Sequence, residues 1–165
     1  MSQQEEAQAR LVSYMLSFLQ EHERDDELVE LEASNLVAAL EAAITLRMPR
    51  ELIALTLALV PFLERRGRYV LADQYLRQAY EAAVALGEPL SQLRLLEHLA
   101  RVAGQRGELS LARRLGQESR ASYETLGHHQ AAAEVTDFMH TLSSLDQDAP
   151  LTTAEHAPGP DLPGW

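Results

Sequence analysis

Three charged residues in the middle of the chain have a spacing that suits recognition of an acidic group. Arg94, Glu97 and Arg101 stand at positions i, i+3 and i+7, which share one face of a helix. A guanidinium offers a planar pair of donors to a carboxylate, so this face could clamp an acidic partner. The same pattern is also typical of a solvated ladder of helical ion pairs, each worth roughly a few tenths of a kcal/mol.

Residues for catalysis or metal binding are scarce. The chain has no cysteine and no lysine, which excludes thiolate sites, Schiff bases and lysine-containing phosphate loops. The motifs GxSxG and HExxH are absent, and no two histidines have the i, i+4 spacing of a helical zinc site. We therefore predict a protein that is not an enzyme and that needs no cofactor or metal.

A repeat organises the chain. The segment Glu64–Gly87 reappears forty residues later as Gly104–Gly127, with identical residues at four aligned pairs: Gly67 and Gly107, Ala72 and Ala112, Leu86 and Leu126, Gly87 and Gly127. Glycine permits the left-handed backbone that closes a helix, and a small alanine lets two helices approach closely. Each copy is therefore predicted to be a helical hairpin.

Apolar periodicity and the Gly and Pro positions place the helices. We expect them at Gln3–His22, Glu27–Arg47, Pro49–Arg66, Tyr69–Leu86, Pro89–Arg106, Leu109–Leu126 and His128–Leu145. They form three antiparallel hairpins, 5–47, 50–86 and 90–126, and a final capping helix, 129–145. The first hairpin is degenerate, because Glu27 and Glu32 take the glycine and alanine positions; terminal repeats are often atypical.

The sequence also supports predictions for the helix Glu27–Arg47 and for the C-terminal end of the chain. The helix Glu27–Arg47 has an apolar face that includes Leu31, and Asn35 interrupts this face. A buried amide needs partners, so we expect Asn35 to bond the backbone of the adjoining hairpin. Residues 1–145 are predicted to form one helical repeat domain. Residues 146–165 are predicted to be a disordered, Pro-rich acidic tail, with a linear motif at Trp165 as the alternative.

The G-x-x-x-x-A junctions at Gly67–Ala72 and Gly107–Ala112 resemble those of tetratricopeptide repeats. In addition, Glu32, Asn35, Leu36, Ala39 and Leu40 are similar to a segment that precedes the repeats of bacterial signal-transduction ATPases with numerous domains. The resemblance covers about residues 10–145 and implies a right-handed superhelical array that binds a partner or a small inducer. It does not extend to the ATPase or to a DNA-binding segment, whose motifs this chain lacks.

In such an array the first helices of the hairpins line the concave face. Repeat positions place eleven candidate partner-binding residues there: Tyr14, Leu57, Pro61, Glu64, Arg65, Arg94, Glu97, Arg101, Gln105, Glu134 and Asp137.

Charge and composition limit the classes of partner that we expect this chain to bind. The net charge of −11 comes from the two ends, since residues 49–145 carry equal numbers of acids and bases. A neutral body with acidic ends argues against direct nucleic-acid binding, and the longest apolar run is too short to span a membrane. We therefore expect a cytoplasmic interaction or regulatory module that binds a protein or peptide. Small-molecule sensing through the same groove is the alternative, and self-association through the end helices also stays open.

Overall fold

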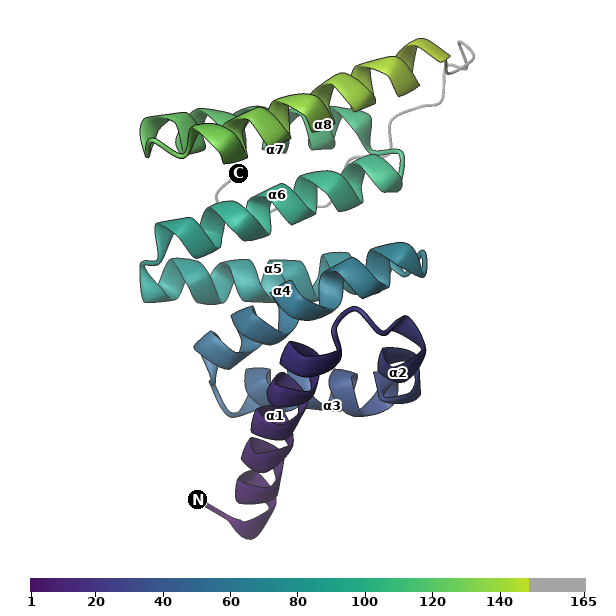
Figure 1. The fold of residues 1–165 in the computed structure, drawn as a ribbon. Helices are drawn as coiled ribbons and strands as arrows, with labels where there is room; N and C mark the ends of the chain where they lie inside the picture. Colours follow the sequence, from purple (N-terminus) through teal and green to yellow (C-terminus); the bar gives the residue numbers. More distant parts are fainter. Residues whose placement is uncertain (149–165) are drawn as a thin grey trace. The chain divides into compact units, whose positions relative to one another are not determined.

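The computed structural model describes residues 1–148 of the chain. Within these residues the backbone forms eight α-helices and no strand, which confirms the predicted all-α class (Figure 1). Their bounds are α1 Gln3–His22, α2 Asp26–Leu31, α3 Ala33–Thr45, α4 Pro49–Arg65, α5 Tyr69–Leu86, α6 Pro89–Gln105, α7 Leu109–Thr125 and α8 His129–Asp148.

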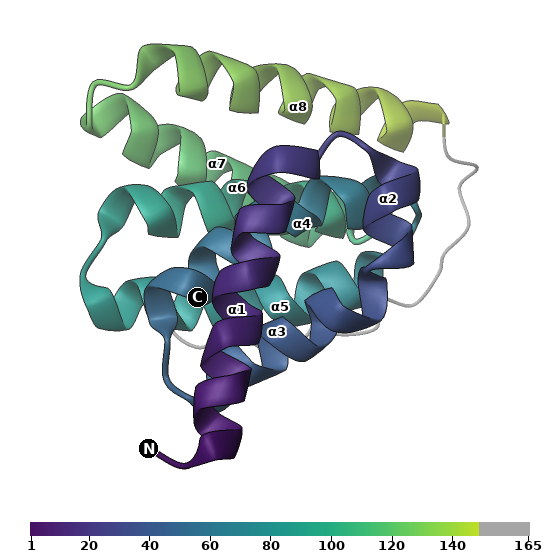
Figure 2. The same ribbon diagram turned by 60° about the horizontal axis from the view of Figure 1, so that its bottom comes forward.

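The chain divides into two compact units, each described by itself. The first is Met1–Leu95, which holds α1 to α5 and the beginning of α6. The second begins at Leu96 and holds the rest of α6 with α7 and α8. In the first unit α1 packs on α3 and α4, and α4 packs on α5 (Figure 2). In the second unit α7 packs on α8.

Left-handed residues recur every 20 positions, at Arg47, Gly67, Gly87, Gly107 and Gly127. At Gly67 the amide of Arg68 donates to the carbonyl of Leu63 at 2.8 Å, and the amide of Gly67 donates to the carbonyl of Glu64 at 3.0 Å. The same two bonds recur at the other four positions, which is the Schellman ending of a helix. The predicted roles of Gly67 and Gly107 are thus confirmed. Arg47 ends α3 with the same left-handed backbone, although it is not a glycine.

The first hairpin departs from the other two at Glu32. Instead of one helix over Glu27–Arg47, the structure has α2 and α3 with Glu32 between them. By the repeat register, Glu32 takes the position of Ala72 and Ala112, both of which are fully buried. A glutamate at such a close helix contact would lose its hydration, so the backbone leaves helical geometry there, with φ −97° and ψ 6°.

Two expectations for this region are wrong. Asn35 is exposed, and its side chain donates to Oε2 of Glu32 at 2.9 Å rather than to the backbone of the adjoining hairpin. Leu31 does not join the apolar face, because 80% of its surface is exposed. Both outcomes follow from the break at Glu32, since the buried face of α3 begins only at Leu36.

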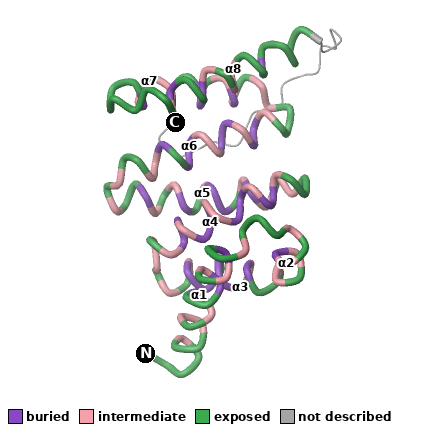
Figure 3. The backbone as a smooth tube through the Cα atoms, viewed as in Figure 1, coloured by how far each residue is buried: buried purple, intermediate pink, exposed green. Residues whose placement is uncertain are grey.

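Helix α4 contributes the largest share of the buried residues of the first unit. Eight of its residues are buried: Leu52, Ile53, Leu55, Thr56, Leu59, Val60, Phe62 and Leu63. The helix is less completely enclosed than its apolar sequence suggests, because Ala54, Leu57, Ala58 and Pro61 are half-buried. Their spacing of three or four residues places them on a single helical face. Figure 3 shows both buried and half-buried stretches along α4.

In the second unit, glycines let α8 come close to its neighbours. A Cβ atom on Gly104 would lie 2.8 Å from Cδ2 of Leu142, and one on Gly116 would lie 3.2 Å from Cγ of Met139. Leu142 clusters with buried Ala103 and Ala112. Helix α8 continues to Asp148, three residues beyond the predicted domain boundary at residue 145. The rest of the predicted tail, with Trp165, lies outside the described residues.

Candidate functional site

The candidate partner-binding residues lie at equivalent repeat positions on α1, α4, α6 and α8, together called the accessible stripe. None of the eleven residues is buried: Tyr14, Arg65, Arg94, Gln105, Glu134 and Asp137 are exposed, and Leu57, Pro61, Glu64, Glu97 and Arg101 are half-buried. Tyr14 exposes 65% of its surface, which is unusual for a large aromatic side chain. The stripe therefore consists of groups that a partner can reach within each unit.

The predicted clamp on α6 is largely satisfied by its own neighbours. Arg101 donates to Oε1 of Glu97 at 2.9 Å, and the hydroxyl of Tyr123 donates to Oε2 of the same carboxylate at 3.3 Å. The Arg101 guanidinium also lies over the Phe138 ring, 5.3 Å from its centroid. These contacts match the helical ion-pair ladder. Only Arg94 is exposed and has no ion pair within residues 1–148.

Arg65 is also engaged within the first unit. Its Nη2 lies 2.6 Å from Oδ1 of Asp26, and its Nε lies 2.9 Å from Oδ2, so the pair has the two-pronged geometry of a strong charge-assisted contact. Hydrogen bonding from Arg65 lowers the pKa of Asp26 below its ordinary value. This arginine ties α2 to the end of α4 and is not a free group of the stripe.

A second arginine pair lies beside the first. Arg68 donates to Oε1 of Glu30, and this bond lowers the pKa of that carboxyl group. The sequence analysis did not predict either pair, although the sequence contains both the arginines of Arg65–Arg68 and the acidic residues of α2. The available signal was the separation of 38 or 39 residues, close to the repeat length, which brings equivalent helix ends together.

A polar contact inside the first unit was likewise missed. The hydroxyl of Tyr75, which is buried on α5, donates to Oε1 of Glu41 on α3 at 2.6 Å. Burial is the main reason that the pKa of Tyr75 rises well above that of a free phenol. The contact satisfies a buried hydroxyl and links two hairpins, so its role is structural.

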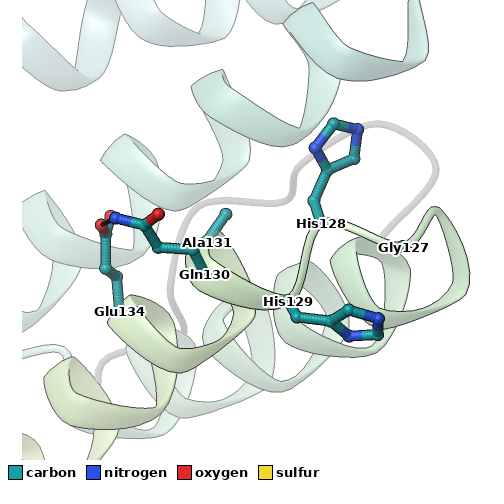
Figure 4. A pocket seen from close by; sticks show the side chains of 6 residues that line it. All are labelled: Gly127, His128, His129, Gln130, Ala131 and Glu134. Carbon is teal, nitrogen blue, oxygen red and sulfur yellow. Dashed lines mark hydrogen bonds between the residues drawn. The ribbon is translucent and has the colours of Figure 1, made fainter.

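An open hollow of about 530 Å³ lies in the second unit at the turn between α7 and α8. It is lined by Gly127, His128, His129, Gln130, Ala131 and Glu134. The two imidazole rings point in different directions, while the Gln130 side chain reaches Glu134 at 3.5 Å (Figure 4). Within the described residues no group of three or more histidines, cysteines and carboxylates could hold a metal ion.

The comparisons with known proteins return no relative. No family model, no curated protein and no solved structure matches the chain. Across residues 1–148, no helix combines the length and the apolar character needed to cross a membrane.

Proposed function

We propose that this chain is a non-enzymatic binding module that holds a protein or peptide along the accessible stripe. In this proposal its hairpins continue as a right-handed tetratricopeptide-like array, and the partner is neither nucleic acid nor membrane. The activity would be regulatory, through occupancy of the stripe.

The chemistry of the stripe is the observation that carries the proposal. At one repeat position the four helices present Tyr14, Ala54, Arg94 and Glu134, none of which is buried. The next repeat position is buried, and it is apolar in each copy: Leu55 on α4, Leu95 on α6 and Val135 on α8. Folding constrains the buried positions and leaves the stripe free, so its varied aromatic, apolar and charged groups fit selection for a partner.

The experiment compares two exposed arginines. Arg94 belongs to the stripe, while Arg114 is exposed on α7, a helix that contributes no residue to the stripe, and neither forms an ion pair within residues 1–148. The tagged protein and the variants Arg94→Ala, Leu57→Asp and Arg114→Ala are used to capture partners from the cytoplasm of the source cells. We expect Arg94→Ala and Leu57→Asp to reduce recovery of the same partner by about ten-fold, whereas Arg114→Ala retains it.

Equal recovery with all three variants would refute binding through the stripe. Circular dichroism of each variant checks that lost binding does not reflect lost folding. If the stripe instead serves a small molecule, the alternative function, the captured protein carries a ligand that mass spectrometry detects and that Arg94→Ala loses.

A further inference from the structure

The turn between α4 and α5 concentrates positive charge. Arg65, Arg66 and Arg68 surround Gly67, and we call these three arginines the turn cluster. Two carboxylates of α2 lie on it: Asp26 pairs with Arg65, and Glu30 pairs with Arg68. Arg66 is exposed and has no carboxylate partner within the described residues. Glu64, which directly precedes Arg65, also acts electrostatically on that arginine, so three acids face the three arginines and the feature left over is the exposed guanidinium of Arg66.

The guanidinium groups are held in place before any partner arrives. Arg66 and Arg68 both lie over the ring of buried Phe62, at 5.7 and 5.6 Å from its centroid. Gly67, with φ 68°, fixes the turn between them. Ordering that is already present in the free protein is not a cost of binding, which favours recognition of an anionic group.

The repeat itself does not require this arrangement. In the second copy Gln105, Arg106 and Glu108 take the places of Arg65, Arg66 and Arg68. Arg106 there lies 3.3 Å from Glu108, so that turn pairs its own charges. The turn cluster is thus a particular property of the α4–α5 turn and not part of the hairpin design.

Helix α2 is only lightly attached to the first unit. It has six residues, of which Val29 alone is buried, and its last residue, Leu31, is mostly exposed. Helices this short are not stable by themselves in water. Its position therefore depends on buried Val29 and half-buried Leu28, its Asp25 cap and the two ion pairs with the turn cluster.

We propose that the turn cluster is a docking surface for an acidic helical segment of a partner protein, and that α2 occupies this surface in the free protein. Asp26 and Glu30 are four residues apart, the spacing that puts two carboxylates on one helical face. A partner helix with acids at this spacing would reproduce both pairs and also engage Arg66. Arg65 belongs to both the turn cluster and the accessible stripe, but the stripe is tested at Arg94 and Leu57 and the turn cluster at Asp26, Glu30 and Arg66, so either proposal can fail without the other.

The test measures binding of a fluorescent alanine-based helical peptide with glutamate at every fourth position, by anisotropy in low and physiological salt. The variant Asp26→Asn/Glu30→Gln removes the internal competitor. Its control, Asp73→Asn/Glu88→Gln, makes the same charge change and breaks two other arginine pairs of the first unit, with Arg77 and Arg50. We expect the first variant to bind at least about five-fold more tightly than the wild type and the control.

Arg66→Gln supplies the second arm, because it breaks no ion pair within the described residues. Added to Asp26→Asn/Glu30→Gln, it should weaken peptide binding by about five-fold or more, while circular dichroism shows that the helical fold is retained despite the lost contact with Phe62. Equal binding by the two double variants, or binding insensitive to Arg66→Gln, would overturn the proposal. Equally tight, Arg66-dependent binding of a single-stranded oligonucleotide of the same charge would also overturn it, since the surface would then attract any polyanion.

Discussion

Replacing Arg47 by glycine should stabilise the first unit. Arg47 has φ 54° at the repeat position that Gly87 and Gly127 occupy. A side chain in the left-handed region costs about 1–2 kcal/mol. Glycine removes this cost but gives the unfolded chain more freedom, which takes back about 0.5–1 kcal/mol. The expected net gain is about 0.5–1 kcal/mol, since the Arg47 side chain is exposed and has no ion pair within the described residues.

The measurement is urea unfolding followed by far-UV circular dichroism, with amide hydrogen exchange to assign the change to the first unit. A chain of this size should gain roughly 2–3 °C in Tm. Arg47→Ala is the matched control, because it removes the same side chain but keeps a Cβ atom in the left-handed region. If Arg47→Gly is no more stable than Arg47→Ala, backbone strain at this turn is not what limits the hairpin.

Three further predictions concern groups that are buried or closely packed. Ser119→Ala should stabilise the second unit by about 1 kcal/mol in urea unfolding, because the fully buried Ser119 hydroxyl has no hydrogen-bond partner within residues 1–148; a loss of stability would show that the hydroxyl is satisfied. Gly104→Ala should cost about 1 kcal/mol, because overpacking against Leu142 outweighs the gain in helix propensity. The cost should shrink in a Leu142→Ala background, and a strictly additive double-mutant cycle would contradict this contact. Stability should decline above about pH 10, where the unfolded phenol of Tyr75 ionises and the folded one stays protonated. Tyr75→Phe should reduce this decline in pH-dependent unfolding, although it also leaves Glu41 without its hydrogen bond.

The helix ends were predictable wherever a glycine or proline marks them. The ranges expected for α1 and α5 agree with the structure at both ends, because Gly87 and Pro89 stop α5 and polar residues follow α1. The ending at Arg47 was harder to interpret, since nothing in an arginine indicates a left-handed backbone. The repeat register was the available signal, since Arg47 takes the position of Gly87 and Gly127 and lies 20 residues before Gly67.

The incorrect predictions lie where one copy of the repeat has a different residue at a close contact between helices. The repeat register placed Glu32 at the position of the close-packed alanines, but it does not show that the helix breaks there to accommodate the larger residue. The break that follows exposed Leu31 and Asn35. Within the candidate site, exposure was predictable from repeat position. The ion pair of Arg101 with Glu97 was foreseen as the ladder alternative. The pairing of Arg65 with Asp26 was not, because it depends on which side chains two hairpins bring within hydrogen-bond distance.

The packing of α8 also bears on how the array could be extended by engineering. Helix α8 binds its neighbours through Phe138, Met139 and Leu142. Its other side carries Ala133, Thr136, His140 and Ser143, none of which is buried. The residues of α6 forty positions earlier are all apolar and buried: Leu93, Leu96, Ala100 and Ala103. A copied hairpin added after α8 would meet a largely polar surface. A copied hairpin inserted between α7 and α8 would meet apolar surfaces on both sides. New repeats should therefore be added before α8 and not after it.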